Sequence, residues 1–113
     1  MIIFLDDNKR PEWYGLKSGK FFHFTDGDRA LLFCKEAPID VLYLDHELGN
    51  SMRGYHVLLN LIQKFKNPPK TVVCISMDVL GICLIEALCK KFDIPYEYLS
   101  PPDDAFMDIE HYG

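Results

Sequence analysis

The chain has 113 residues, of which 49% are hydrophobic and 13% aromatic. This length fits one domain and is too short for two, and the hydrophobic content argues against a disordered chain. The net charge of −5 disfavours a protein that grips an extended nucleic-acid duplex, because binding to its phosphates needs a basic face.

The sequence also bears on the compartment. No apolar run is long enough to cross a membrane, and the N-terminus lacks the basic region and cleavage site of a signal peptide. The four cysteines form no CxxC pair and lie in apolar segments, which indicates small, reduced core residues. We therefore expect a cytoplasmic protein that has no membrane partner. The cysteines are Cys34, Cys74, Cys83 and Cys89.

The first apolar run, Met1 to Leu5, predicts a strand that is covered on both faces. Asp6 and Asp7 follow it directly. Residues 9–19 contain one proline and two glycines, which disfavour a full helix. A second short strand is predicted at residues 21–24.

Segment 25–28 has a capping residue followed three positions later by an acid, so we expect a helix from there to Ala37. Pro38 ends this helix. The apolar run Ile39 to Leu44 predicts the third strand, and residues 45–53 form a loop that ends at a glycine.

Apolar side chains at helical spacing predict a helix over residues 55–66, which Asn67-Pro68-Pro69 ends. A fourth strand follows at 71–75, and a helical stretch opens at 76–81 and runs to about Lys91. The fifth strand is predicted at 96–99. We expect one domain over residues 1–99 and little regular structure in the tail, 100–113, which has two prolines and four acids.

Strands that alternate with helices predict a doubly wound parallel sheet of five strands. The flavodoxin-like strand order 2-1-3-4-5 makes strands 1 and 3 neighbours, and a crevice opens at their carboxyl ends. The first helix of this arrangement is shortened or missing. This topology brings Asp6, Asp7 and Asp45 together at one edge of the sheet.

Three neighbouring carboxylates repel one another unless they bind a cation. Oxygen ligands of this kind select Mg²⁺, Mn²⁺ or Ca²⁺, and Mg²⁺ held by two or three carboxylates keeps positions for phosphate oxygens. The expected cofactor is therefore Mg²⁺ or Mn²⁺, and the expected partner is a phosphorylated group.

Three further residues of the crevice suit that chemistry. Ser76, which follows the fourth strand, can hydrogen-bond a phosphoryl oxygen. His46 can act as a general acid or base, because the pKa of histidine lies near neutrality. Glu47 can face the metal with its side chain or with its backbone carbonyl.

Each of these residues also has a purely structural interpretation. An aspartate after a strand often begins a turn or caps a helix. His46 can stabilise a loop, and Ser76 can cap the next helix. The joint placement of two acidic strand ends is what favours a binding site over these alternatives.

The acidic pair Asp6-Asp7, together with Asp45, Ser76 and Pro101, resembles the receiver domain of two-component response regulators. In that family the acidic pair and the aspartate of the third strand bind Mg²⁺, and that aspartate accepts a phosphoryl group. Receivers carry a lysine just before the proline, where this chain has Ser100.

A divergent branch, the cyclic-phosphate processing receiver-like domains, is more similar. The similarity lies in FLDDNKRP (4–11), Trp13, LDHELG (44–49) and GYHV (54–57), and it spans roughly residues 1–90. It implies a metal-dependent protein that handles cyclic phosphates or phosphates derived from nucleotides. We assign catalytic roles to Asp45, His46 and Ser76, metal binding to Asp6, Asp7, Asp45 and Glu47, and substrate binding to Ser76, Arg10 and Asp78.

This chain departs from that branch after the fourth strand. The family usually has His-Ser, one residue and then Asn-Pro, where this chain has Ile75-Ser76-Met77-Asp78-Val79. If the family histidine donates a proton, His46 is the substitute here. Asp78 adds negative charge beside a phosphate site unless it faces the metal.

Three hypotheses remain open. The protein is a metal-dependent phosphoesterase for a cyclic phosphate, such as a nucleotide end; or a non-catalytic binding module for a phosphorylated ligand or a protein; or a receiver that accepts a phosphoryl group. The acidic tail is a candidate contact for a protein partner.

Overall fold

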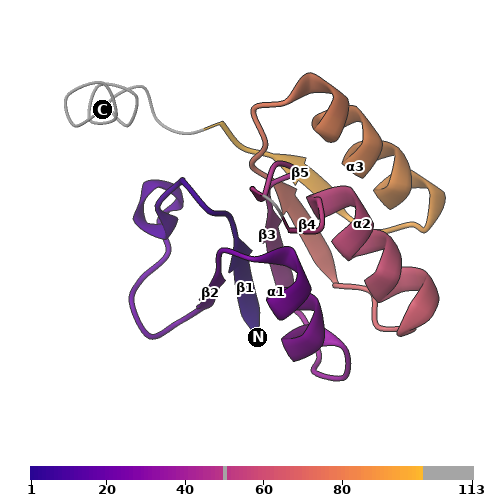
Figure 1. Cartoon of the computed structure of the whole chain (residues 1–113), viewed down its shortest axis with the longest axis horizontal. Helices are drawn as coiled ribbons and strands as arrows, with labels where there is room; N and C mark the ends of the chain where they lie inside the picture. The colour runs from indigo at the N-terminus through magenta and orange to yellow at the C-terminus, as the bar shows by residue number, and fades with distance from the viewer. Residues whose placement is uncertain (50, 101–113) are drawn as a thin grey trace.

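The computed structural model describes residues 1–49 and 51–100, which contain one five-stranded sheet of order β2-β1-β3-β4-β5 (Figure 1). The strands are β1 (Ile2–Leu5), β2 (Phe22–Phe24), β3 (Val41–Leu44), β4 (Thr71–Cys74) and β5 (Tyr96–Tyr98). All neighbouring strands pair in parallel, which confirms the predicted doubly wound sheet. The predicted tail, except for Ser100, lies outside the described residues.

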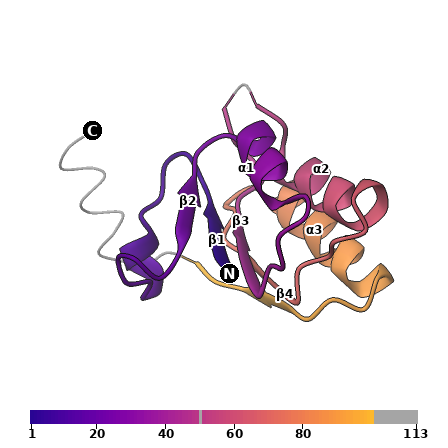
Figure 2. The same ribbon diagram turned by 90° about the horizontal axis from the view of Figure 1, so that it is seen from below.

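Three α-helices cover one face of the sheet. They are α1 (Gly27–Cys34), α2 (Gly54–Leu59) and α3 (Val79–Lys91), and α2 runs on into the π-helical turn η2 (Asn60–Lys64). Figure 2 shows all three on the same side. Between β1 and β2 there is only the 3-10 helix η1 (Pro11–Tyr14), as expected for a first helix that is shortened or missing. No helix in the described ranges is long and apolar enough to cross a membrane.

Helix α1 begins where the sequence predicts but ends earlier. Asp26 caps it, because Oδ1 accepts hydrogen bonds from two N–H groups of the first turn, at 2.8 and 3.1 Å. The helix ends at Cys34 and not at Ala37. Pro38 has no N–H to offer the carbonyl oxygen of Cys34. The side-chain amide of Asn67 supplies this hydrogen bond at 2.8 Å.

The sheet separates two apolar layers of unequal size. Because side chains alternate along a strand, Ile3 and Leu5 pack in the large core beneath the α-helices, whereas Phe4 faces the other way. On that second face Phe4 packs with Val73 and Ile75, and the segment around η1 covers them.

The same alternation, continued past the strand ends, separates the polar residues of the predicted site. It assigns Asp6 and Asp45 to the η1 side of the sheet, and His46 and Ser76 to the side of the α-helices. His46 does lie against α3, since a Cβ atom on Gly81 would overlap the His46 side chain.

A glycine holds the start of α2 against the loop after β3. The N–H of Gly54 donates to the carbonyl oxygen of His46 at 3.0 Å, and a Cβ atom on Gly54 would overlap the carbonyl oxygen of Asp45. The main chain of Asp45 and His46 therefore directly contacts the first turn of α2.

We predict that Gly54→Ala lowers the free energy of unfolding by at least about 2 kcal/mol, because the added methyl group meets main chain that cannot move aside. Urea denaturation measures the loss. The control is Gly19→Ala, where a Cβ atom meets open space and only the positive φ of 81° is strained. That control costs about 1 kcal/mol. Equal losses in the two variants would contradict the close contact.

Candidate functional site

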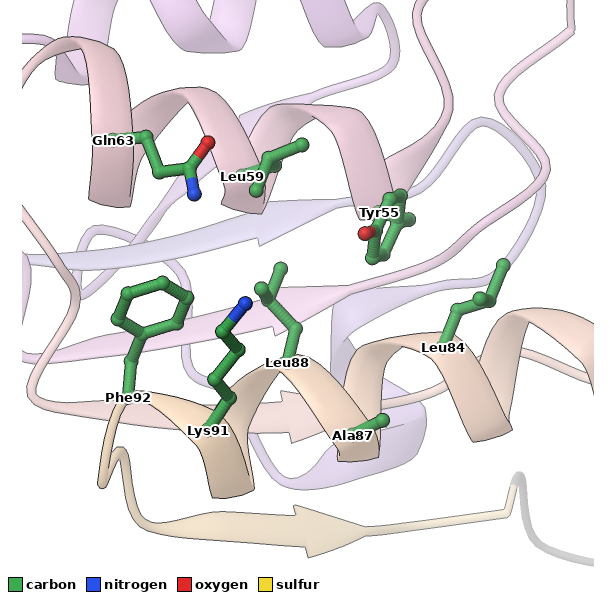
Figure 3. A pocket seen from close by; sticks show the side chains of 8 residues that line it. All are labelled: Tyr55, Leu59, Gln63, Leu84, Ala87, Leu88, Lys91 and Phe92. Atoms are coloured by element: carbon green, nitrogen blue, oxygen red, sulfur yellow. The ribbon is translucent and has the colours of Figure 1, made fainter.

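Two hollows of similar size lie among the described residues and are candidates for a site. The first lies between α2 with η2 and α3, and Figure 3 shows side chains from both helices turned into it. Its lining is mostly apolar, with Lys91 as the only charged lining residue in the described chain. The lining residues are Tyr55, Leu59, Gln63, Leu84, Ala87, Leu88, Lys91 and Phe92.

The second hollow lies at the carboxyl ends of β1, β3 and β4, and we call it the acidic cleft. Its volume is about 370 Å³, near the lower end of the range of roughly 300–1,000 Å³ for small-molecule sites. The residues that line it are Asp7, Asn8, Lys9, Asp45, Glu47, Gly49, Ser76, Met77 and Asp78. It holds most of the residues that the sequence singled out, so it is the candidate site.

Three carboxylates meet at one end of the acidic cleft. Asp6 is fully buried, Asp45 is 5% exposed and Asp7 is exposed, and one oxygen of each lies within 4.8 Å of the others. The parallel pairing of Leu5 with Leu44 places the first and the last of these side by side. The structure therefore brings the three together as the strand order predicts.

Asp6 folds the chain back over the strand ends. Its Oδ1 accepts hydrogen bonds from the N–H groups of Asn8 and Lys9, at 2.7 and 2.9 Å. As a result the Lys9 side chain returns to the carboxylates. Its Nζ lies 3.0 Å from Asp6 Oδ2 and 3.5 Å from Asp45 Oδ2, and the side chain is only 9% exposed.

Lys9 is not among the site residues predicted from the sequence. The signal that points to it is local: a lysine three positions after a buried aspartate, in a segment that turns back on itself.

The environment of Asp45 disfavours its ionised form. Burial, and then the negative charge of Asp6, raise the pKa of the Asp45 carboxyl to about 6, although Lys9 acts in the opposite direction. Its Oδ1 accepts the N–H of His46 at 2.8 Å. A further cation nearby would stabilise the ionised form of Asp45.

His46 is buried and belongs to the helical side of the sheet. Its Nδ1 accepts the N–H of Tyr55 at 3.4 Å, which assigns the proton of the neutral ring to Nε2. Burial lowers the pKa of the ring. His46 does not line the acidic cleft, but one of its nitrogens lies within 4.8 Å of carboxylate oxygens of Glu47 and Asp78, which do.

Ser76 and Asp78 also line the acidic cleft. Ser76 is buried, and its Oγ accepts the N–H of Asp78 at 3.0 Å. Asp78 Oδ2 in turn accepts the N–H of Gly81 at 3.3 Å and so caps α3. Among the described residues nothing accepts the hydroxyl proton of Ser76, which leaves it free to donate to a ligand.

The remaining sequence assignments lie at the margin of the acidic cleft. The side chain of Glu47 is 55% exposed and pairs with Arg53 at 3.1 Å, and it is not one of the three clustered carboxylates. Arg10 is exposed and does not line the cleft. The roles assigned to Glu47 and Arg10 stay predictions. Ile75 is fully buried in the smaller apolar layer, and Ser100 is exposed.

Comparison with known proteins gives a family and a fold. The family model described as cyclic-phosphate processing receiver domain matches residues 1–91. No curated protein matches this chain.

Two solved structures are similar in fold. One is the N-terminal domain of a response regulator/sensory box/GGDEF three-domain protein from Carboxydothermus hydrogenoformans. It has 17% identity and a TM-score of 0.58, with 98% of this chain and 90% of that chain covered. The other is a yeast Spc42 trimeric coiled-coil segment fused to another structure. It has 18% identity and a TM-score of 0.62, with 98% of this chain and 76% of that chain covered.

We predict that Asp45→Asn stabilises the protein at pH 7 when no divalent cation is present. The folded-state pKa of about 6 lies above the usual value near 3.9, so ionisation of Asp45 favours the unfolded chain. At pH 7 the full penalty applies, and its removal raises the free energy of unfolding by about 1–3 kcal/mol. The asparagine keeps an oxygen that can accept the N–H of His46.

Urea denaturation in the presence of a chelator measures this gain. The gain shrinks as the pH falls from 7 towards 4, because Asp45 becomes protonated in both states. The control is Asp7→Asn, since Asp7 is exposed and its substitution changes the net charge equally. A loss of stability in Asp45→Asn at pH 7 would contradict the conclusion that burial of the ionised Asp45 carboxylate is unfavourable.

Proposed function

This chain belongs to the family of cyclic-phosphate processing receiver domains, and we propose that it binds a divalent cation and, beside it, a cyclic phosphate or related phosphorylated nucleotide that it hydrolyses. The cation is Mg²⁺ or Mn²⁺. The ligands would be Asp6, Asp7 and Asp45. The ligand's phosphate would occupy the acidic cleft next to Ser76.

The observation that carries this proposal is the convergence of three carboxylates at the acidic cleft. Their oxygens lie within 4.8 Å of one another, and hard oxygen donors are the ligands that Mg²⁺ and Mn²⁺ select. Three carboxylates and the single ammonium of Lys9 leave two formal negative charges, which a divalent cation balances. The residues therefore fit such an ion.

A divalent ion bound there would supply positive charge to phosphate oxygens and promote the ionisation of water. The chain's own groups would do the rest. The Ser76 hydroxyl would donate to a phosphoryl oxygen. The neutral ring of His46, with its proton on Nε2, stays our candidate for proton transfer. Its neighbours Glu47 and Asp78 line the acidic cleft.

The size of the site supports a small substrate. A cleft of about 370 Å³ suits a nucleotide or a nucleotide end more than a long polymer. The net charge of −5 also disfavours binding along a nucleic-acid backbone.

A second candidate function is binding without turnover. It is favoured by the lack of an imidazole among the residues that line the acidic cleft in the described part of the chain. Ile75 stands where the resemblance to the cyclic-phosphate branch implies a histidine, and His46 is buried and does not line the cleft. In that case the same carboxylates and Ser76 would hold a phosphorylated ligand, or a protein that carries one.

We predict that the purified protein hydrolyses at least one member of a panel of 2′,3′-cyclic and 3′,5′-cyclic nucleotides when Mg²⁺ or Mn²⁺ is present. A chelator abolishes the reaction, because the acidic cleft then repels the phosphate. Asp45→Asn lowers kcat by at least about 100-fold, an effect of the size seen when one charge-stabilising group is lost. Product formation is followed by chromatography.

The matched control is Asp40→Asn, which removes an exposed carboxylate outside the acidic cleft and leaves turnover unchanged. An intact panel under all metal conditions would overturn the enzymatic proposal. If a cyclic nucleotide binds in the presence of Mg²⁺ and is recovered unchanged, the binding module is the correct function.

A further inference from the structure

Lys9 carries the only ammonium that lines the acidic cleft within the described chain. Its side chain is almost fully enclosed, with 9% exposure, and touches the two buried carboxylates of Asp6 and Asp45. Buried carboxylates without a positive partner are strongly destabilising. Lys9 is therefore the resident cation of the site when no metal ion is bound.

The two oxygens that contact the ammonium are also those that a metal ion would need. Asp6 uses Oδ1 for two backbone N–H groups, and Asp45 uses Oδ1 for the N–H of His46. This leaves Oδ2 of each residue, and both of these oxygens face the Lys9 ammonium. An ammonium and a divalent cation therefore compete for the same pair of oxygens.

The side chain of Lys9 can move without the main chain. The hydrogen bonds from Asn8 and Lys9 to Asp6 hold the backbone of the turn. The ammonium itself sits at the end of a flexible four-carbon stem. Lys9 lines the acidic cleft, so the space next to it is the space where a phosphate would bind.

We propose that Lys9 is an exchangeable cation: its ammonium occupies the Asp6–Asp45 pair in the metal-free protein, and a divalent ion displaces it into the acidic cleft, where it binds the phosphate. This inference rests on the proposed function, because it requires the metal and phosphate sites described above. Lys9 then becomes a phosphate-binding residue that acts only in the metal-loaded protein.

Charge balance explains why phosphate binding depends on the bound metal ion and on Lys9. With a divalent ion and the Lys9 ammonium both present, the three positive charges match the three carboxylates. The three clustered carboxylates then no longer repel a phosphate, and the other carboxylates that line the cleft are Glu47, which pairs with Arg53, and Asp78. Without Lys9 the same loaded site keeps one negative charge, which repels a phosphate.

The test is Lys9→Gln, studied by isothermal titration calorimetry with Mg²⁺ alone and then with inorganic phosphate at saturating Mg²⁺. We expect Mg²⁺ to bind about tenfold more tightly than in the wild type, since its competitor is gone, and phosphate to bind about tenfold more weakly. The control is Lys17→Gln, an exposed lysine that does not line the cleft, and it changes neither affinity.

The outcomes separate the two proposals. If wild type and Lys9→Gln bind Mg²⁺ equally, or if phosphate affinity is unchanged in Lys9→Gln, the exchange is wrong and the metal site stands. If neither protein binds Mg²⁺ or Mn²⁺, the metal site itself is wrong, and the exchange falls with it.

A measurement on the wild type covers the case in which Lys9→Gln does not fold. In protein labelled with carbon-13 at lysine, the Cε signal of Lys9 shifts when Mg²⁺ is added and shifts again with inorganic phosphate. The signal of Lys17 stays in place. A Lys9 signal that Mg²⁺ does not move would overturn the exchange.

Discussion

The parallel pairing of β1 with β3 is the constraint on which the rest of the site depends. In this register Leu5 lies opposite Leu44, so the next residues, Asp6 and Asp45, emerge beside each other from a buried sheet. Two carboxylates in that position repel each other and lose solvation, and they are tolerated only beside positive charge. The turn after β1 brings the Lys9 ammonium back to these carboxylates and so supplies that positive charge.

Signals that are local in the chain predicted much of this arrangement. Apolar runs ended by acids indicated the strands, and their alternation with helices indicated a parallel sheet. The usual order for five such strands, 2-1-3-4-5, then made the meeting of the acidic strand ends predictable. The end of α1 could not be predicted in this way, because it involves a hydrogen bond from Asn67, which is distant in the sequence. The sequence also placed His46 among the residues of the crevice, whereas its ring packs against α3 and does not line the acidic cleft.

The sheet divides the polar groups in and next to the acidic cleft into two sets. Asp6 and Asp45, with Lys9, belong to the thinly covered face near η1, and they form the charged part of the site. His46 and Ser76 belong to the face of the α-helices, where each is tied to a backbone N–H group of the helical layer or its entry loop. A ligand bound as proposed would therefore meet Asp45 on one side of the sheet and Ser76 on the other.

Gly54 and Gly81 have a consequence for how such a site can diversify. Neither position has room for a side chain, because one abuts the main chain of Asp45 and the other abuts the ring of His46. Substitutions that alter ligand preference in the proposed site would therefore fall at solvent-facing positions that line the cleft, such as Glu47 and Met77. A single substitution there would change the lining of the cleft and leave the close packing around Asp45 and His46 in place.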